Sequence, residues 1–146
     1  MYWRLVDYKR GARPDSPMTP IVESLSNTDL RDLAAYFAAQ IPASDTTTPA
    51  ISSTTPGETL FRTGDPARGI PPCQGCHGAD AQGTTDARFL TWPVLRGQYA
   101  DYVVTRLTEF REGKYTTTSD SLIMQSVVQG LDDDDMRAIG TWLESL

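Results

Sequence analysis

The pentapeptide Cys73-Gln74-Gly75-Cys76-His77 lies at the middle of this 146-residue chain and has the pattern C-x-x-C-H. This pattern is the attachment signature of a c-type haem. The two thiols add across the two vinyl groups of the haem, and the histidine places an imidazole nitrogen on the iron. Covalent attachment lets a small domain hold a flat cofactor that it does not fully bury. The motif therefore predicts haem c, bound through Cys73 and Cys76, with His77 as an iron ligand.

Paired cysteines have two other common uses, and the sequence favours neither of them. A thioredoxin-type C-x-x-C motif opens a helix in a βαβ unit, and no strand pattern is present here. A zinc site needs four ligands, whereas the chain contains two Cys and one His. A redox dithiol and a metal shared with another chain stay open as alternatives to haem.

An iron with one histidine ligand has a sixth position to fill, and methionine sulfur is the donor that suits an electron carrier. The chain contains four methionines. Met136 lies on the apolar face of a predicted helix, where core packing explains it. Met124 lies in a segment that we expect to be a loop, from which it can reach across the open haem face. We therefore predict Met124, in preference to Met136, as the second axial ligand.

The other ring nitrogen of a metal-bound histidine normally donates a hydrogen bond to a carbonyl or a carboxylate. We expect Trp92-Pro93-Val94-Leu95 to form the wall on the histidine side of the cofactor. The carbonyl of Pro93 is the predicted acceptor, so that Pro93 joins the candidate site residues.

Composition excludes several classes of protein. The chain carries 13 Lys and Arg against 19 Asp and Glu, for a formal net charge of −6. Because nucleic-acid binding needs a basic patch, nucleic acid is not the expected partner. No apolar run approaches the roughly 18 residues of a membrane span. The N-terminus has no secretory signal, and taken alone it predicts a protein that stays in the cytoplasm.

Two regions of the chain repeat one another on either side of a Pro-, Thr- and Ser-rich stretch at 40–57, which we interpret as a linker. The sequence that follows Met18 matches the sequence that follows Met124, and the segments before these methionines match at a slightly smaller offset. The matched pairs are Leu5/Leu107, Tyr8/Phe110, Gly11/Gly113, Met18/Met124, Val22/Val128, Leu25/Leu131, Asp29/Asp135, Leu30/Met136, Leu33/Ile139, Tyr36/Trp142 and Phe37/Leu143. The repeat predicts two similar units, of which the first lacks the part that holds the haem motif.

Helices account for the periodic segments of both regions. Residues 26–29 and 132–135 have capping-box patterns, and apolar residues recur after each at i, i+3, i+4 and i+7. Further helices are predicted at 98–112, ended by Gly113, and at 58–63. Because no glycine-containing ligand loop follows the acidic run 132–135, we interpret it as the first turn of a helix rather than a calcium site. The fold class is all-α with long loops.

Three segments around the pentapeptide resemble class I cytochromes c. They are Gly64-Asp65-Pro66-Ala67-Arg68-Gly69-Ile70-Pro71-Pro72, Cys76-His77-Gly78-Ala79-Asp80 and Pro93-Val94-Leu95-Arg96-Gly97-Gln98-Tyr99. The repeat is similar to the cytochrome c4 family, in which two such domains follow one another, and 5–40 resembles the C-terminal half of the first of them.

The resemblance implies a class I cytochrome c fold with a particular division of the chain. Residues 1–39 correspond to a partial unit without a haem motif, 40–57 to the linker, and 58–146 to a complete haem domain. It further implies a periplasmic electron carrier with one haem c per chain, which is not an enzyme. Its partners in the family are redox proteins such as a quinol-oxidising complex and a terminal oxidase.

Two other functions fit the same motif. A haem enzyme such as a peroxidase needs an open sixth position at the iron, against which the presence of Met124 argues. A haem-bearing subunit or domain of a larger dehydrogenase or oxidase complex would keep both axial ligands. Slow or absent binding of cyanide or carbon monoxide distinguishes a carrier from a haem enzyme.

The sequence departs from the cytochrome c4 pattern in three places. The first unit has no C-x-x-C-H motif, so Met18 has no haem to ligate. No signal peptide is present, although the family acquires its haem outside the cytoplasm. Residues 114–120 replace a shorter loop in the first unit. We expect a truncated sequence whose full-length form carries a signal peptide; the alternative is a complete protein with an N-terminal docking extension.

Overall fold

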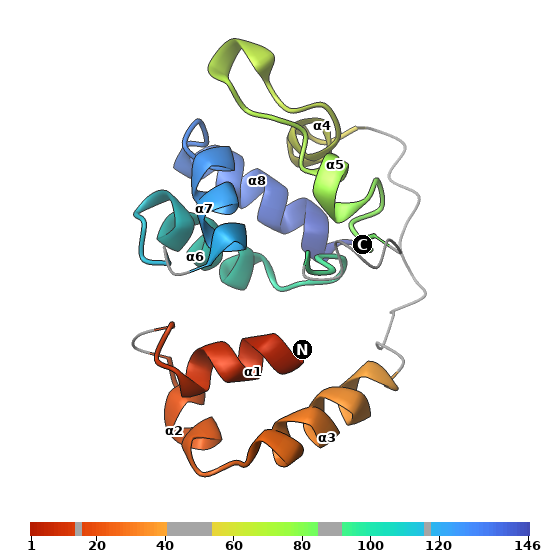
Figure 1. Ribbon diagram of the computed structural model, residues 1–146. Helices are drawn as coiled ribbons and strands as arrows, with labels where there is room; N and C mark the ends of the chain where they lie inside the picture. Colours follow the sequence, from red (N-terminus) through yellow and green to blue (C-terminus); the bar gives the residue numbers. More distant parts are fainter. Residues whose placement is uncertain (14–15, 41–53, 85–91, 116–117) are drawn as a thin grey trace. The chain divides into compact units, whose positions relative to one another are not determined.

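The computed structural model describes residues 1–13, 16–40, 54–84, 92–115 and 118–146. Their regular secondary structure is helical, as predicted, and apart from one isolated β-bridge between Asp65 and Ile70 these residues contain no strand. The chain divides into two compact units, Met1–Ser44 and Asp45–Leu146 (Figure 1). The border between them, like most of the predicted linker, lies outside the described residues.

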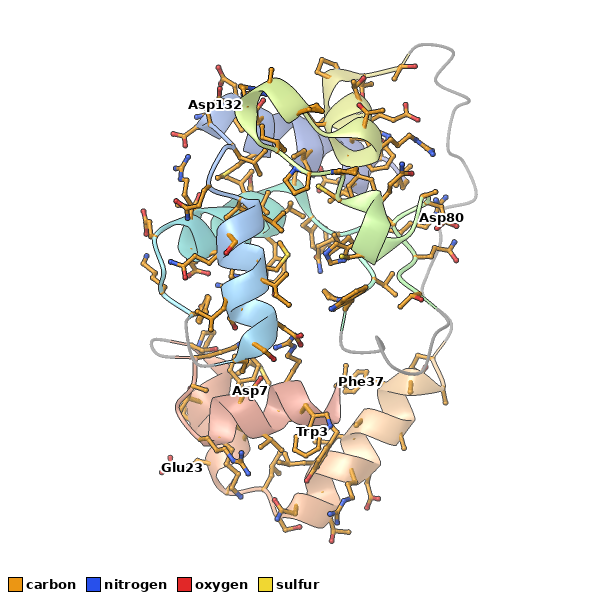
Figure 2. All side chains as sticks on the ribbon, turned by 45° about the horizontal axis from the view of Figure 1, so that its top comes forward. Trp3, Asp7, Glu23, Phe37, Asp80 and Asp132 are labelled. Carbon is orange, nitrogen blue, oxygen red and sulfur yellow. The ribbon has the colours of Figure 1, made fainter. Side chains whose placement is uncertain are left out.

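The first unit contains the helices α1 (Tyr2–Lys9), α2 (Met18–Glu23) and α3 (Asn27–Ala38), and α1 packs against both of the others. Its small core consists of Leu5, Val6, Val22 and Leu30. Larger apolar side chains remain exposed on the same helices, among them Trp3 on α1 and Phe37 on α3 (Figure 2). This unit therefore buries only part of the apolar face of its longest helix.

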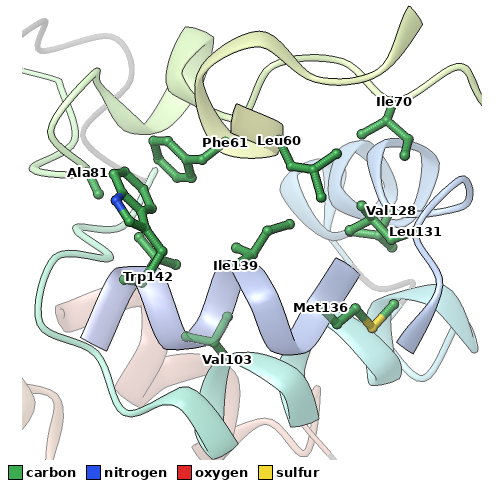
Figure 3. Packing of buried hydrophobic residues seen from close by; sticks show 11 residues of the cluster. Leu60, Phe61, Ile70, Ala81, Val103, Val128, Leu131, Met136, Ile139 and Trp142 are labelled. Atoms are coloured by element: carbon green, nitrogen blue, oxygen red, sulfur yellow. The ribbon is translucent and has the colours of Figure 1, made fainter. Parts of the chain in front are cut away.

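The second unit contains a longer set of elements. These are α4 (Pro56–Thr63), the 3-10 helix η1 (Pro66–Arg68), α5 (Gln74–His77), α6 (Ala100–Arg111), α7 (Ser119–Val127) and α8 (Asp133–Glu144). Helix α8 packs against both α6 and α4, and the core lies between these helices (Figure 3). The core residues are Leu60, Phe61, Ile70, Ala81, Val103, Val128, Leu131, Met136, Ile139, Trp142 and Leu143.

Capping side chains set the helix starts close to the predicted positions. In α3 the Ser26 hydroxyl accepts from the Asp29 amide at 3.2 Å, while the Asp29 carboxylate accepts from the Ser26 amide at 2.7 Å. Asp132 and Asp135 form the same reciprocal pair at the start of α8. Both predicted capping boxes are thus confirmed. Helix α4 begins two residues before its predicted start, because Thr55 caps it.

The prediction that Met124 lies in a loop was wrong, because residues 119–127 form helix α7. The Thr118 hydroxyl accepts from the Ser121 amide at 3.2 Å and caps this helix. Three of its apolar residues, 122–124, are consecutive, which obscured the spacing of four between Ile123 and Val127 in the sequence. Met124 is therefore carried by a short helix.

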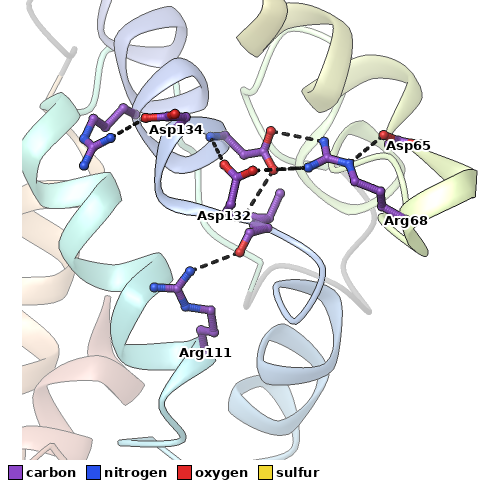
Figure 4. Close-up of polar contacts among 8 residues, drawn as sticks. Asp65, Arg68, Arg111, Asp132 and Asp134 are labelled. Carbon is purple, nitrogen blue, oxygen red and sulfur yellow. Dashed lines mark hydrogen bonds and ion pairs between the residues drawn. The ribbon is translucent and has the colours of Figure 1, made fainter.

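Arginine side chains pair with the acidic run at the start of α8 (Figure 4). Arg68 on η1 donates to both carboxylate oxygens of Asp135, at 2.7 and 3.1 Å, and to Asp65 at 2.7 Å. Arg111 on α6 donates to Asp133 at 2.8 Å. These pairs tie the segment that precedes the haem motif, and helix α6, to the start of α8.

Candidate haem site

The short helix α5 places the two cysteines and the histidine of the motif on one turn. The His77 amide donates to the Cys73 carbonyl at 3.0 Å, and the Gly78 amide donates to the Gln74 carbonyl at 3.0 Å. Gly78 has φ +78°, which ends the helix directly after the histidine. The local backbone thus holds Cys73, Cys76 and His77 together.

Both cysteines are free thiols and half-buried. Cys73 packs against the apolar core of the second unit. Burial raises the pKa of the Cys73 thiol to about 11, so that the thiol is protonated at neutral pH. A redox-active dithiol of the thioredoxin type depends on a lowered pKa. The environment of Cys73 therefore argues against the dithiol alternative.

The imidazole of His77 is buried, and its Nδ1 lies 2.9 Å from the carbonyl oxygen of Pro93. Because a carbonyl only accepts, Nδ1 carries the proton and donates. Burial lowers the pKa of His77 and the hydrogen bond to Pro93 opposes this shift, so that the ring is neutral at neutral pH. The lone pair of Nε2 is then available to a metal, which is the state that a histidine ligand needs.

Backbone contacts of residues 78–83 accompany the approach of Pro93 to the histidine. The Gly83 amide donates to the His77 carbonyl at 2.7 Å, and a Cβ on Gly78 would lie 2.5 Å from the Gly83 carbonyl oxygen. Buried Ala81, at φ +59°, accepts at its carbonyl from the Leu95 amide at 2.8 Å. Sequence reasoning missed these backbone contacts, for which Gly78 and Gly83 are the only visible signal.

The two candidate methionines have different environments. Met136 is fully buried in the core, and the Thr108 hydroxyl lies 3.7 Å from its sulfur. Met124 on α7 is half-buried and packs against the same core from outside, as Cys73 does. The structure thus gives Met136 a packing role and places Met124 and Cys73 against one apolar cluster.

Exposed apolar side chains flank the candidate ligands in sequence. Val94 follows Pro93, and Leu122 and Ile123 precede Met124; all three are about half exposed. A haem needs an apolar surface for its faces together with cysteine and histidine donors. The residues present therefore fit this cofactor: Cys73 and Cys76 would attach it and His77 would bind its iron.

Within the described residues, no three His, Cys, Asp or Glu side chains come together as a metal site. None of the helices in this part of the chain has both the length and the apolar character to cross a membrane.

Comparison with known proteins identifies what the chain is similar to. The family model for cytochrome c matches residues 55–146. Cytochrome c4 of Azotobacter vinelandii is 38% identical over 98% of this chain and 70% of its own length. The solved structure of cytochrome c4 from Acidithiobacillus ferrooxidans aligns with all of this chain over 82% of its own length, at 28% sequence identity and a TM-score of 0.83. A solved thiosulfate dehydrogenase from Marichromatium purpuratum aligns with 98% of this chain over 30% of its own length, at 29% sequence identity and a TM-score of 0.81.

Proposed function

This chain belongs to the cytochrome c family and, within it, to the cytochrome c4 proteins, and from that premise we propose that it is a periplasmic electron carrier with a single covalent haem. Cys73 and Cys76 attach the haem, and His77 and Met124 are the axial ligands of its iron. Residues 58–146 form the complete haem domain, and 1–39 correspond to the C-terminal half of a similar domain.

The observation that carries this proposal is the geometry of His77. The ring is buried and neutral, and its Nδ1–H is engaged by the Pro93 carbonyl at 2.9 Å. This hydrogen bond fixes both the tautomer and the orientation of the ring, so that Nε2 points away from Pro93. A histidine held in this way, one residue after a cysteine pair, is prepared to bind iron before the metal arrives.

Bound haem supplies a one-electron couple between ferric and ferrous iron. The role of the protein is to keep the positions of the ligands unchanged between the ferric and ferrous states. The Pro93 carbonyl prevents His77 from rotating, and the hydrogen-bonded backbone of α7 restrains Met124. An apolar surface around the cofactor limits the entry of water. With fixed ligands and little water, little reorganisation accompanies each electron transfer.

Exchange of each methionine tests the ligation. Met124→Ala should open the sixth position, lower the reduction potential and let carbon monoxide bind. Met136→Ala, the matched control, should keep the ligation and destabilise the haem domain by roughly 2–5 kcal/mol, as for a truncated buried methionine. Carbon monoxide titrations and denaturant unfolding, followed at the haem bands, measure both effects. The opposite pair of results would mean that Met136 is the ligand.

A second candidate function is that of a haem-bearing subunit or domain in a larger dehydrogenase complex. The similarity to a solved thiosulfate dehydrogenase, of which this chain matches less than a third, favours it. Both functions require the same site, and they differ in the electron donor. Reduction of the purified chain by a quinol-oxidising complex supports the free carrier, whereas reduction only within a stable complex with a dehydrogenase supports the subunit.

Charge suggests the chemistry of the redox partner. Residues 58–146 contain eight basic and thirteen acidic side chains, and the haem propionates add negative charge. We therefore expect a partner with a basic surface, such as a quinol-oxidising complex or a terminal oxidase. Electron transfer to it should slow as salt rises, since exposed charges are screened beyond about 10 Å at 0.1 M salt. A rate that is independent of ionic strength would indicate apolar docking instead.

A further inference from the structure

Tyr115 is a buried phenol in the loop between α6 and α7. Its hydroxyl accepts a hydrogen bond of 2.7 Å from the guanidinium of Arg106, and its ring lies edge-on to Phe110, with 6.0 Å between the ring centroids. Nothing in the proposed haem attachment uses this tyrosine. Its position inside the unit, rather than on the loop surface, calls for another role.

Arg106 is the centre of a small network on α6. Its guanidinium carbon lies 5.3 Å from the ring centroids of both Tyr102 and Tyr115. One of its nitrogens lies 2.8 Å from the Glu109 carboxylate. Because these charged and polar groups are partly withdrawn from water, losing one partner leaves the others poorly satisfied. The network therefore holds Tyr115 firmly against α6.

The place of Tyr115 in the loop connects this network to the methionine helix. Gly113 ends α6 at φ +71°, and the Lys114 amide donates to the Glu109 carbonyl at 2.9 Å. Tyr115 then turns back onto α6, and Thr118, three residues later, caps α7. Helix α7 carries Met124. Because three residues span at most about 11 Å, a fixed Tyr115 limits where α7 can begin, and with it the approach of the Met124 side chain.

The first unit fastens the corresponding loop by a different pair of residues. Arg4 and Asp7 repeat the Arg106–Glu109 ion pair at matched positions, with 3.4 Å between their charged atoms. In that unit the loop residue is Arg13, which donates to the hydroxyl of Tyr8 on α1 at 2.9 Å. An arginine–tyrosine contact therefore closes the loop before the methionine helix in both units, with the partners exchanged. Two different solutions to the same restraint indicate that the restraint itself matters.

We propose that Tyr115 and Arg106 are positioning residues that hold helix α7 so that the Met124 sulfur stays at the sixth position of the haem iron. This inference rests on the axial ligation given under Proposed function. Neither residue touches the iron; both act through the start of α7. Loosening the contact lets the Met124 sulfur dissociate from the iron more often, although the ligand itself is kept.

The variant Tyr115→Phe keeps the ring against Phe110 and removes only the hydroxyl. The measurement is the rate at which added imidazole replaces Met124 in the ferric holoprotein, followed by loss of the methionine–iron absorption band. We expect the rate to rise about tenfold, the factor that corresponds to one lost hydrogen bond of about 1.4 kcal/mol. Arg106→Lys, which keeps the charge and loses the planar fork, should raise the rate as well.

Tyr102→Phe is the matched control, because Tyr102 contacts the same guanidinium from within α6. Its rate should stay within about twofold of the unaltered protein, since a surface hydroxyl contributes little. Thermal unfolding, followed by far-UV circular dichroism, shows whether Tyr115→Phe loosens the whole domain; a fall in midpoint that accounts for the faster rate overturns the positioning role.

The remaining outcomes separate the inference from the function on which it rests. An unchanged imidazole rate in Tyr115→Phe, with the methionine–iron band present in the unaltered protein, overturns the positioning role and leaves the ligation intact. Absence of that band from the unaltered protein overturns the ligation, and the positioning role with it.

Discussion

Helices α3 and α8 occupy matched positions in the two units, and one side of each is buried in the same way. Leu30 on α3 and Met136 on α8 are both fully inaccessible to solvent. Val22 and Val128, which precede the two helices, are equally buried. Each of the two helices packs against the helix two positions earlier in the chain, α1 or α6. The repeat in the sequence thus corresponds to a repeated packing arrangement.

Further toward their C-terminal ends, the apolar faces of these two helices differ. Leu33 and Phe37 on α3 are 36% and 51% exposed, whereas the matched Ile139 and Leu143 on α8 are 3% and 0% exposed. Helix α4 accounts for the difference in the second unit, where it packs against α8. The described residues of the first unit contain no counterpart of α4. An amphipathic pattern therefore predicts a helix and its apolar face, but not whether a partner covers that face.

The largest expected effect comes from truncating the covered side of α8. Leu143→Ala should destabilise the haem domain by about 2–5 kcal/mol, since it opens a cavity in a packed core. The matched Phe37→Ala should change the stability of the first unit by no more than about 0.5 kcal/mol, because its side chain is already exposed. Denaturant unfolding, followed at the haem bands and by circular dichroism, measures the two.

Leu30→Ala serves as the control for the first unit, because Leu30 is fully buried there. It should destabilise that unit clearly, which shows that the method detects a loss in so small a core. A cost for Phe37→Ala as large as that for Leu30→Ala would mean that a partner covers the exposed side of α3 in solution.

A somewhat smaller effect is expected from forcing α4 away from α8. A Cβ on Gly57 would lie 2.0 Å from the carbonyl oxygen of Ala138 on α8. Gly57→Ala must therefore shift α4, at a cost near the upper end of the about 1–3 kcal/mol that overpacked cores lose. The thermal midpoint of the haem domain measures this cost. An unchanged midpoint would mean that α4 does not rest on α8 at this point.

The smallest expected effect is the loss of stability at low pH that depends on Asp29 and Asp135, the aspartates at the third residue of the two capped helices. The pKa of Asp135 is lowered mainly by its hydrogen bonds to Arg68, and that of Asp29 by its hydrogen bonds to Ser26. A carboxylate with a lowered folded pKa stabilises the fold above its unfolded pKa, and this contribution is lost as the pH falls below that value. Each acid should therefore contribute to stability at neutral pH and less in acid.

Exchange for the amide tests this dependence. Asp135→Asn should flatten the fall in stability of the haem domain below about pH 4, the range in which a free aspartate takes up its proton. Asp29→Asn should do the same to a lesser degree, because Asp29 has no arginine partner comparable to Arg68. Unfolding midpoints measured from pH 7 to pH 3 compare the two, and equal acid sensitivity in both variants would argue against a role for Arg68.

Features that depend on neighbouring residues were predictable from the sequence. The haem motif, both capping boxes and the glycine that ends α6 are set by residues within one or two turns of each other, and the structure contains the expected local geometry. The hydrogen bond between His77 and Pro93 spans a longer segment, yet the need of a ligand histidine for an acceptor pointed to it.

Features that depend on packing were not predictable in the same way. Helix α7 has three consecutive apolar residues, which obscured its helical periodicity, and the Thr118 cap and contacts with α6 stabilise it. No sequence pattern indicated the contact between Tyr115 and Arg106, since a tyrosine in a polar loop is normally exposed. The helix that carries Met124 therefore had to be read from the structure.

The near-infrared magnetic circular dichroism of the ferric holoprotein tests the central claim most directly, because this spectrum reports the pair of axial ligands at a haem iron. The account predicts the signature of histidine–methionine ligation in the unaltered chain, from His77 and Met124. A spectrum of histidine with water, or with any donor other than methionine sulfur, would contradict it.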